Sequence, residues 1–411
     1  MATSWGDQKA LVIMSNTKVP NPEIEVRLQG LQERLASQSL DGAFIVQRAD
    51  LYYLSGCLNV DYMFIPSEGQ PVLFFLVEPS ANVASMLTDQ CYTIDGSDEL
   101  QKILKRKFAT AARRIGLELD IISYNEFRSY GEFFDGAEIF DVSPLILDLR
   151  SRKSDWELER MKDASKITAR LFDEIRSLVG PGISEMELAA EAEAYAQGLG
   201  NQFIDIRVRD YKTEGYPWHI LSGENGGMLG LLDSPASGQG SSAAFPCGAS
   251  QKLIRTKEPI MVDFAYELDG YHVDETRMFS IGPMPDDGMR ASEAAIKIHN
   301  YVLDHVRAGV RAGDLFDYSV SKAHELGYED SYLGPIGYKV SFVGHGIGTE
   351  LIEWPLIAKG REDMLEPGMT FALEPKIVFK DQFIAGVESV VAVTEDGFEL
   401  ISKVPVEVFI C

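Results

Sequence analysis

The chain has 411 residues, 45% of them hydrophobic and 25% charged, which is long enough for two folded domains. Its 63 acidic and 38 basic residues give a formal net charge of −25, which argues against nucleic acid and anionic membranes as partners, because both need a basic surface. No apolar run approaches the roughly 20 residues of a membrane span. The four scattered cysteines form no Cys-x-x-Cys pair. We therefore expect a cytoplasmic protein without a disulfide framework.

The first third of the chain has the pattern of a small α/β domain. Residues 1–21 are expected to form a lead-in, and residues 22–150 the domain itself. A helical pattern of apolar residues starts at Pro22. Apolar runs at 43–46 and 71–77 predict short buried strands, and strands and helices continue to alternate beyond them.

A polar stretch, Arg150-Ser-Arg-Lys-Ser-Asp155, marks the boundary to a second domain at 154–411. Ser154 is expected to cap the next helix, because Glu157 follows three residues later as the partner of a capping box. The sequence thus predicts two domains joined by a short polar segment.

The second domain contains a faint internal repeat. Pro181-Gly-Ile-Ser and Arg311-Ala-Gly-Asp each place a glycine and a Ser or Asp cap before a predicted helix. The acidic strands around Asp263 and Glu388 are separated by nearly the same number of residues as these two motifs. We interpret this as a duplicated helix-then-hairpin unit, in which each half supplies acidic ligands to a shared centre.

Five residues of the second domain have side chains that bind metals: Asp263, Asp274, His345, Glu374 and Glu388. Four carboxylates converging on one buried spot would repel one another unless cations held them. An oxygen-rich set with one imidazole favours Mn²⁺, Co²⁺, Fe²⁺ or Zn²⁺ and lacks the thiolates of structural zinc sites. Four negative charges would balance two divalent ions, which can activate a bridging water while a glutamate carries the proton.

The segment Glu267-Leu-Asp-Gly270 is a turn signal between two β-rich runs. If these four residues form the turn, Asp263 and Asp274 face each other directly, with Cβ atoms about 5 Å apart. Like charges opposed in this way destabilise a hairpin, so we expect a divalent ion between them. Asp269 and Glu275 of the same hairpin are expected to be surface charges or caps.

Several motifs in this region have a familiar order and spacing. They are Val262-Asp-Phe, Asp274-x-Thr-Arg277, Gly344-His-Gly-Ile-Gly348, Leu373-Glu-Pro375, and Glu388 before Val393-Thr-Glu-Asp-Gly397. With them the chain resembles the pita-bread (M24) metallopeptidases, in the branch of aminopeptidase P, prolidase and creatinase. The region 22–145 resembles the smaller N-terminal domain of that branch.

The resemblance implies a mixed α/β (α+β) fold, with a creatinase-like N-terminal domain before a pita-bread catalytic domain of pseudo-twofold symmetry. It implies that Asp263 binds one metal ion and that Asp274 and Glu388 bridge two. His345 and Glu374 would bind the second ion, and Glu374 would also carry the proton. Two divalent ions, foremost Mn²⁺ with Co²⁺, Zn²⁺ or Fe²⁺ as alternatives, and a homodimer are expected.

The residues that orient substrate in Xaa-Pro-cleaving relatives are largely missing. Two histidine positions are Ser341 and Ile352 here, and an arginine position is Gly386. His219 and His272 are candidates to take their place as catalytic residues; His272 shares a strand face with Asp274 by the period of two.

Three functions follow from these observations. The favoured one is an Xaa-Pro dipeptidase or aminopeptidase that uses a metal-bridging water to hydrolyse a small peptide. The second is a creatinase- or ectoine-hydrolase-like enzyme that cleaves a C–N bond in a small non-peptide amide. The third is a non-catalytic protein that uses the same fold to bind a partner.

Overall fold

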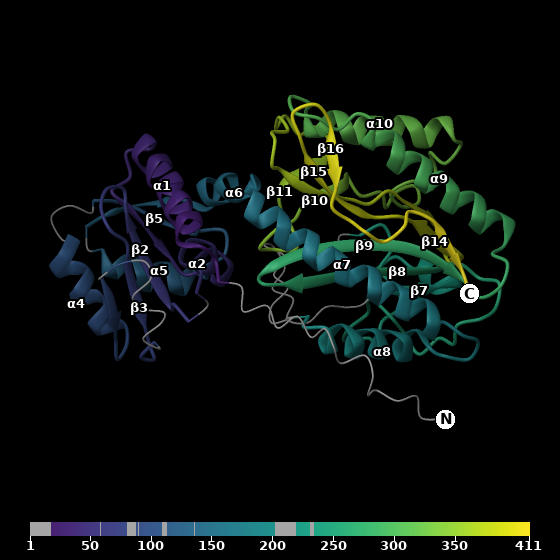
Figure 1. The fold of residues 1–411 in the computed structure, drawn as a ribbon, viewed down its shortest axis with the longest axis horizontal. Coiled ribbons are helices and arrows are strands. Elements are labelled where there is room, and N and C mark those ends of the chain that lie inside the picture. Colours follow the sequence, from purple (N-terminus) through teal and green to yellow (C-terminus); the bar gives the residue numbers. More distant parts are fainter. Residues whose placement is uncertain are drawn as a thin grey trace. The chain divides into compact units, whose positions relative to one another are not determined.

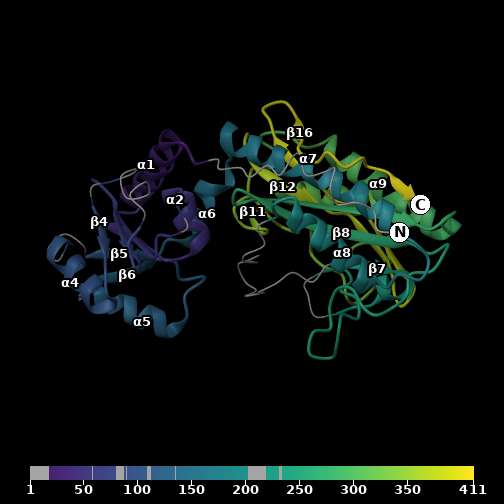
Figure 2. The same ribbon diagram turned by 60° about the horizontal axis from the view of Figure 1, so that its bottom comes forward.

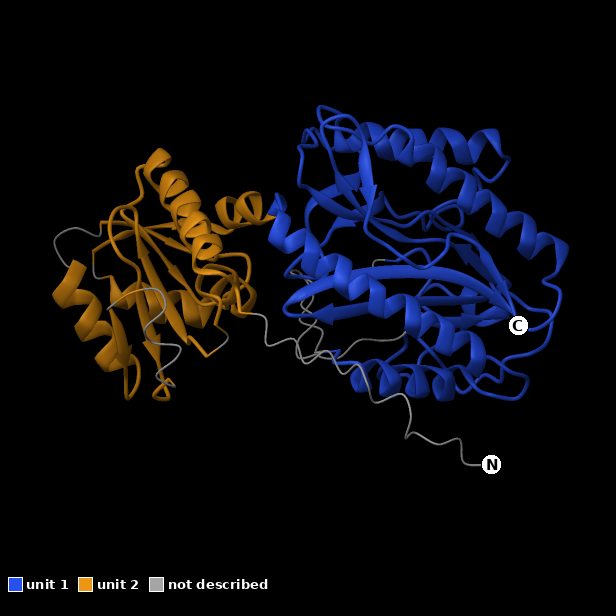
Figure 3. Ribbon diagram, viewed as in Figure 1, with its two compact units in different colours: residues 1–15, 151–208, 212–411 blue, residues 16–150, 209–211 orange. Residues whose placement is uncertain are grey.

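The computed structural model describes residues 18–57, 59–79, 88, 90–108, 113–134, 136–201, 219–230 and 234–411. The expected lead-in falls outside this range as far as residue 17. The chain divides into two compact units, coloured separately in Figure 3. One comprises residues 16–150 and 209–211, and the other residues 1–15, 151–208 and 212–411. No helix in the described ranges combines the length and the apolar character needed to cross a membrane.

As far as the structure describes it, the N-terminal unit is built on one mixed sheet of six strands, in the order β4-β3-β2-β1-β5-β6. Strands β1 to β3 pair antiparallel, and β4, β5 and β6 join by parallel pairing. The strands are β1 (Gly42–Ile45), β2 (Tyr62–Pro66), β3 (Val72–Phe75), β4 (Cys91–Thr93), β5 (Arg114–Leu117) and β6 (Glu138–Asp141). The apolar runs at 43–46 and 71–77 therefore form β1 and β3, as predicted.

The first helix of this unit buries an apolar face. In the first helix Leu28, Leu31 and Leu35 recur at helical spacing and are buried, which confirms the helix predicted from Pro22 onward. The helices are α1 (Asn21–Ser37), α2 (Arg48–Ser55), α4 (Ser97–Phe108), α5 (Tyr124–Phe133) and α6 (Ser143–Ser151). Phe44, on the sheet, packs against the aromatic rings of α5.

The C-terminal unit begins with two helices and a sheet. Ser154 and Glu157 form the predicted capping box at the start of the first helix, and Ser184 and Glu187 form another at the second. The elements are α7 (Asp155–Leu178), α8 (Glu185–Gly198), β7 (His219–Ser222), η2 (Gly223–Gly227), β8 (Ile260–Leu268), β9 (Tyr271–Ser280) and β17 (Val408–Ile410). The sheet has the order β17-β9-β8-β7. α7 lies along β8 and β9 (Figure 1), and α8 lies beside β7 (Figure 2).

A second pair of helices and a second sheet follow. The elements are α9 (Asp286–Leu303), α10 (Ala312–Glu325), β10 (Phe342–Gly346), β11 (Glu353–Ala358), β12 (Thr370–Leu373), β13 (Lys376–Phe379), β14 (Phe383–Gly386), β15 (Ser389–Val393) and β16 (Phe398–Leu400). The sheet has the order β11-β10-β12-β15-β16, and β13 and β14 form a separate hairpin. Each half of the unit thus contains a helix pair and a sheet, as expected of a duplicated arrangement.

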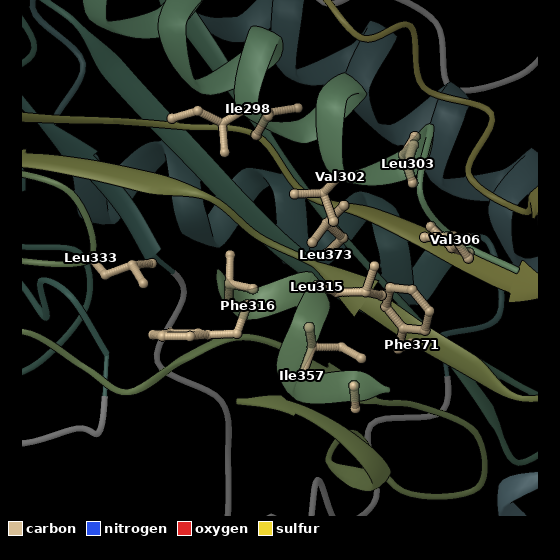
Figure 4. Packing of buried hydrophobic residues seen from close by; sticks show 14 of the residues in the cluster. Ile298, Val302, Leu303, Val306, Leu315, Phe316, Leu333, Ile357, Phe371 and Leu373 are labelled. Atoms are coloured by element: carbon tan, nitrogen blue, oxygen red, sulfur yellow. The ribbon is translucent and has the colours of Figure 1, made fainter. Parts of the chain in front are cut away.

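The helices α9 and α10 pack on the second sheet through a continuous apolar cluster. Figure 4 shows Val302 of α9 and Leu315 of α10 close to Ile357, Phe371 and Leu373 of the strands. Burying each such side chain contributes roughly 1.5–3 kcal/mol, so this cluster holds the strands in a fixed position.

The expected cap at the start of α10 is wrong. The helix begins at Ala312, with Arg311 as its N-cap, so that Gly313 and Asp314 lie inside the first turn. A Cβ atom at Gly313 would lie 2.5 Å from the carbonyl oxygen of Arg361. Position 313 therefore requires glycine because two backbone segments approach each other closely there. Neither Gly313 nor Asp314 caps the helix.

The expected register of the β8–β9 hairpin is also wrong. Leu268 pairs with Tyr271, so the turn is centred on Asp269 and Gly270. Both residues have positive φ, at 52° and 79°, as a two-residue hairpin turn with Asp-Gly requires. The turn therefore lies one residue later than the sequence suggested.

This register pairs Asp263 with Thr276, and Asp274 with Ala265. The two aspartates are consequently diagonal neighbours on one face of the hairpin, not a directly opposed pair. Moving the turn by one residue changes the cross-strand partner of Asp263 by two positions, from Asp274 to Thr276. Because side chains alternate with a period of two, both aspartates still point to the same face of the hairpin.

Candidate metal centre

The five residues expected to bind metal are all buried, and each lies on or beside a strand of the C-terminal unit. Asp263 lies in β8, Asp274 in β9 and His345 in β10. Glu374 directly follows β12, and Glu388 directly precedes β15. None of them is more than 8% exposed. Both sheets therefore contribute to one buried group of side chains.

The most compact part of this group consists of Asp274, His345 and Glu388. Each offers one ligand atom, and these atoms all lie within 4.8 Å of one another. Nε2 of His345 also lies 3.7 Å from Oε1 of Glu374. Nδ1 of His345 lies 3.0 Å from the carbonyl oxygen of Gly346, to which it can donate, which leaves Nε2 to face the carboxylates.

The backbone around the cluster explains how the two sheets supply it together. Leu373 pairs with Ser389, so Glu374 and Glu388 follow at the ends of adjacent strands. The amide of Glu388 donates to the carbonyl oxygen of Thr276 at 3.1 Å, which links the second sheet to β9. The hydroxyl of Thr276 donates to Oε2 of Glu388 at 2.7 Å and fixes the orientation of that carboxylate.

Lys376 lies inside this cluster and was not predicted. Its Nζ donates to Oδ2 of Asp263 at 3.0 Å and to Oε2 of Glu374 at 2.7 Å. It also lies 3.7 Å from Oε2 of Glu388, and its side chain is only 3% exposed. The sequence signal was its position two residues after Glu374, which places both side chains on one face of an extended segment.

The charges of this cluster lie close together and shift one another's pKa values. Burial alone would lower the pKa of Lys376, but the surrounding carboxylates outweigh it and hold that pKa well above its ordinary value. Burial raises the pKa of Asp263, yet the Lys376 ammonium reverses the effect and leaves that pKa below its ordinary value. Burial, and next the neighbouring carboxylates, raise the pKa values of Asp274 and Glu388. Asp274 and Glu388, which lie farther from the ammonium than Asp263 and Glu374 do, are therefore the two acids that the neighbouring carboxylates destabilise most in their charged form.

Three carboxylate oxygens in the cluster are buried and have no hydrogen-bond partner within the described part of the chain. They are Oδ1 of Asp263, Oδ1 of Asp274 and Oε1 of Glu388. A buried polar atom without a partner is costly, so these oxygens indicate where a cation fits. Carboxylate oxygens with one imidazole nitrogen suit a divalent ion such as Mn²⁺, Co²⁺, Fe²⁺ or Zn²⁺.

The two candidate histidines have different neighbours. His219 pairs with Asp263 across β7 and β8, and its Nδ1 lies 3.3 Å from Oδ2 of that residue. His272 lies in β9, where its Nδ1 is 3.1 Å from the carbonyl oxygen of Gly348 and its Nε2 is 3.8 Å from Glu267. The structure therefore brings His219 to the carboxylate cluster, and holds His272 against the Gly344–Gly348 segment.

Glu275 is fully buried, contrary to the expectation of a surface charge, and Asp269 is 8% exposed. The carboxylate of Glu275 accepts a hydrogen bond from Thr168 of α7, on the opposite face of the hairpin from Asp274. Because helices cover the outer face of this sheet, an alternating pattern of side chains did not distinguish core from solvent.

Another buried acid, Glu185, organises the segment next to His219. Its Oε1 accepts from the amide and the hydroxyl of Ser222, at 2.6 and 2.7 Å. Its Oε2 accepts from Asn225 Nδ2 and from the amide and hydroxyl of Ser250, at 2.6, 3.0 and 2.7 Å. The first residue of α8 therefore holds together the end of β7, the turn η2 and the following loop.

The positions that lack the expected substrate-orienting side chains are also defined. Ser341 is exposed and Ile352 is half-buried. Gly386 is buried and pairs directly with Lys376 across the β13–β14 hairpin. A Cβ atom at Gly386 would lie 2.8 Å from Cγ of Lys376, so the lysine stem occupies the space that a side chain at 386 would need.

Comparison with known proteins agrees with this arrangement. Residues 159–395 match the metallopeptidase family M24, and residues 27–152 match the creatinase/prolidase N-terminal domain. An Xaa-Pro dipeptidase of Pyrococcus furiosus is 24% identical, covering 92% of this chain and 97% of its own length. An uncharacterized peptidase of Bacillus subtilis is 25% identical, covering 94% of this chain and 100% of its own length.

Solved structures show the same fold over nearly the whole chain. An Xaa-Pro dipeptidase from Bacillus anthracis aligns with a TM-score of 0.79 at 23% identity, covering 94% of this chain and 100% of its own. An X-Pro aminopeptidase from Thermotoga maritima aligns with a TM-score of 0.76 at 22% identity, covering 93% and 99%. The chain therefore belongs to metallopeptidase family M24, with a creatinase-like α/β domain before a pita-bread catalytic domain that holds a buried Asp/His/Glu group.

Proposed function

We propose that this protein is a metal-dependent hydrolase that cleaves the C–N bond of a small peptide, in the manner of an Xaa-Pro dipeptidase or aminopeptidase. The observation that carries the proposal is the buried group of Asp274, His345 and Glu388, whose ligand atoms lie within 4.8 Å of one another. Membership of family M24 supports divalent metal ions as cofactors. The relatives described as Xaa-Pro dipeptidases support a peptide substrate.

The donor set assigned to the metal centre comprises Asp263, Asp274, His345, Glu374 and Glu388. A bound divalent ion supplies Lewis-acid activation of the scissile carbonyl and of water. Glu374 is assigned the transfer of the proton to the leaving nitrogen, since its carboxylate borders the cluster and can bind a proton reversibly. His219, through its contact with Asp263, is assigned to the wall of the substrate site, and His272 to the support of the Gly344–Gly348 segment.

A second candidate is hydrolysis of a small non-peptide amide or amidine, as in creatinase- or ectoine-hydrolase-like enzymes. The observation in its favour is the absence of basic side chains at Ser341, Ile352 and Gly386. Cationic side chains at these positions would hold a peptide carboxylate by charge-assisted hydrogen bonds, so their absence removes one reason to favour a peptide over another small substrate. Mn²⁺ as the metal, a homodimer and a cytoplasmic location are part of the proposal; light scattering tests the dimer.

The deciding experiment is metal analysis of the purified protein, followed by assays with Mn²⁺ or Co²⁺ restored. An Xaa-Pro dipeptide panel, longer peptides with proline in the second position, and small cyclic amidines should be tested in parallel. We expect turnover of the Xaa-Pro panel. Activity on the amidines alone would select the second candidate. No metal and no turnover after reconstitution would refute both and favour a non-catalytic partner-binding protein.

A further inference from the structure

The ammonium group of Lys376 lies where a cation is needed. Its contacts with Asp263 and Glu374 are charge-assisted hydrogen bonds, and Glu388 lies only 3.7 Å away. Three of the four carboxylates in the cluster therefore already have a positive charge within 4 Å. Only Asp274 has no contact with it.

Lys376 is held in this position by the fold. It is the first residue of β13, directly after Pro375, and it is followed by the buried side chains of Ile377 and Val378. Its stem runs over Gly386, where the absence of a side chain leaves room for it. Within the described residues, the hydrogen bonds and ion pairs of Nζ go only to Asp263, Glu374 and Glu388.

Three side chains of the cluster bring their ligand atoms close to one another. Asp274, His345 and Glu388 each bring one ligand atom to within 4.8 Å of the others, and this group contains neither of the two carboxylates that accept hydrogen bonds from Lys376. Oδ1 of Asp274 and Oε1 of Glu388 are buried without a hydrogen-bond partner in the described chain, and one ion bound between them would supply the coordination that both lack. Oδ1 of Asp263 also lacks a partner in that part of the chain, but the other oxygen of that carboxylate already accepts from the Lys376 ammonium. An ion bound between Asp263 and Glu374 would instead lie within a few ångströms of the ammonium and be repelled by it.

We propose that Lys376 takes the place of one of the two metal ions, so that each chain binds one divalent ion, at Asp274, His345 and Glu388. This inference rests on the proposed function, because it concerns the same metal centre. It replaces the expectation of two ions with one ion and one fixed ammonium. Asp263 and Glu374 then act as partners of Lys376 and as hydrogen-bond acceptors for substrate or water.

The test compares metal stoichiometry in the wild type and in two variants of the full chain. Lys376→Met removes the charge and keeps an unbranched stem of similar length, whereas Lys376→Arg keeps the charge. Apo-protein would be titrated with Mn²⁺, and bound metal measured after removal of the free ion. We expect one ion per chain in the wild type and in Lys376→Arg, and two in Lys376→Met.

Lys252→Met is the matched control, because Lys252 is also a largely buried lysine, paired with Glu258 and Ser222. We expect it to bind one ion, as the wild type does. Electron paramagnetic resonance of the wild type with saturating Mn²⁺ gives a second readout that needs no variant. An isolated six-line Mn²⁺ signal is expected, because a dinuclear centre gives an exchange-coupled spectrum instead.

Two Mn²⁺ ions per wild-type chain with a coupled spectrum would refute the inference and show that Lys376 moves aside on loading. A Lys376→Met variant that folds and still binds one ion would also refute the inference, because Lys376 would then not be what excludes a second ion. Failure of the proposed function has a different outcome, since the wild type and every variant would then bind no metal at all.

Discussion

Replacement of Glu185 by Gln should destabilise the catalytic unit although only one oxygen is exchanged for an NH₂ group. In the wild type both carboxylate oxygens accept hydrogen bonds, and one backbone amide points at each of them, from Ser222 and from Ser250. Gln has one acceptor oxygen, so in either orientation one of these buried amides faces an NH₂ group. The serine hydroxyls can rotate to accept a hydrogen bond, but the amides cannot.

The side-chain orientation of the variant follows from Asn225. Nδ2 of Asn225 donates to Oε2 of Glu185, while its Oδ1 accepts from the amide of Gln239, so it cannot flip without a loss. The side-chain oxygen of the introduced glutamine should therefore take the Oε2 position and leave the Ser222 amide without an acceptor. An unsatisfied buried donor costs roughly 1–3 kcal/mol, and we expect a loss of about 2 kcal/mol in the free energy of unfolding.

Urea denaturation of the apo-protein, followed by tryptophan fluorescence, measures this effect. Trp156 and Trp354 lie in the described part of the catalytic unit, and residues 16–150 contain no tryptophan, so unfolding of the N-terminal unit does not expose one. Glu187→Gln is the control, since Glu187 lies in the same helix but is exposed, where water can replace its contacts with Ser184. Unfolding free energies of wild type and Glu185→Gln that agree within about 0.5 kcal/mol would refute the reasoning.

Three further predictions concern the metal centre and the core. Glu388→Ala should abolish metal binding, measured by elemental analysis, as well as hydrolysis; full activity would remove Glu388 from the donor set. Chelation with EDTA should lower both the activity and the melting temperature, and Mn²⁺ should restore them, whereas an unchanged melting temperature would contradict binding to the folded chain. Burial lowers the pKa of His299 to about 4 in the folded chain, whereas the unfolded chain has the ordinary value of about 6.5. As the pH falls from 6.5 to 4, the unfolded chain therefore binds a proton that the folded chain does not, and the free energy of unfolding decreases. The loss is at most about 3 kcal/mol, and His299→Leu should flatten this part of the stability–pH curve; an equal slope in both proteins would refute it.

The sequence predicted those parts of the fold that depend on local signals. The capping box of Ser154 and Glu157 needs only two side chains and a helix start, and it is present. The hairpin register failed because Glu267-Leu-Asp-Gly270 allowed two placements of the turn. The pairing of Leu268 with Tyr271 and the positive φ of both Asp269 and Gly270 distinguish them.

The motifs predicted to bind metal identified side chains that the structure brings together, but they did not reveal what else enters the cluster. Lys376 was missed because Pro375 interrupts the strand, so the period of two could not be applied across it with certainty. Glu275 was misassigned because the sheet is buried on both faces. In both cases the missing information was tertiary: which element covers a face, and which side chain fills the space left by Gly386.

The position of Lys376 also has a consequence for biogenesis. The side chains of the cluster come from strands that are far apart in the chain, so the cluster is complete only after both halves of the catalytic unit have packed together. A lysine belongs to the chain, and its effective concentration at the cluster does not depend on the metal content of the cell. The newly made protein can therefore bury its four carboxylates before it meets a metal ion, with Lys376 neutralising part of their charge.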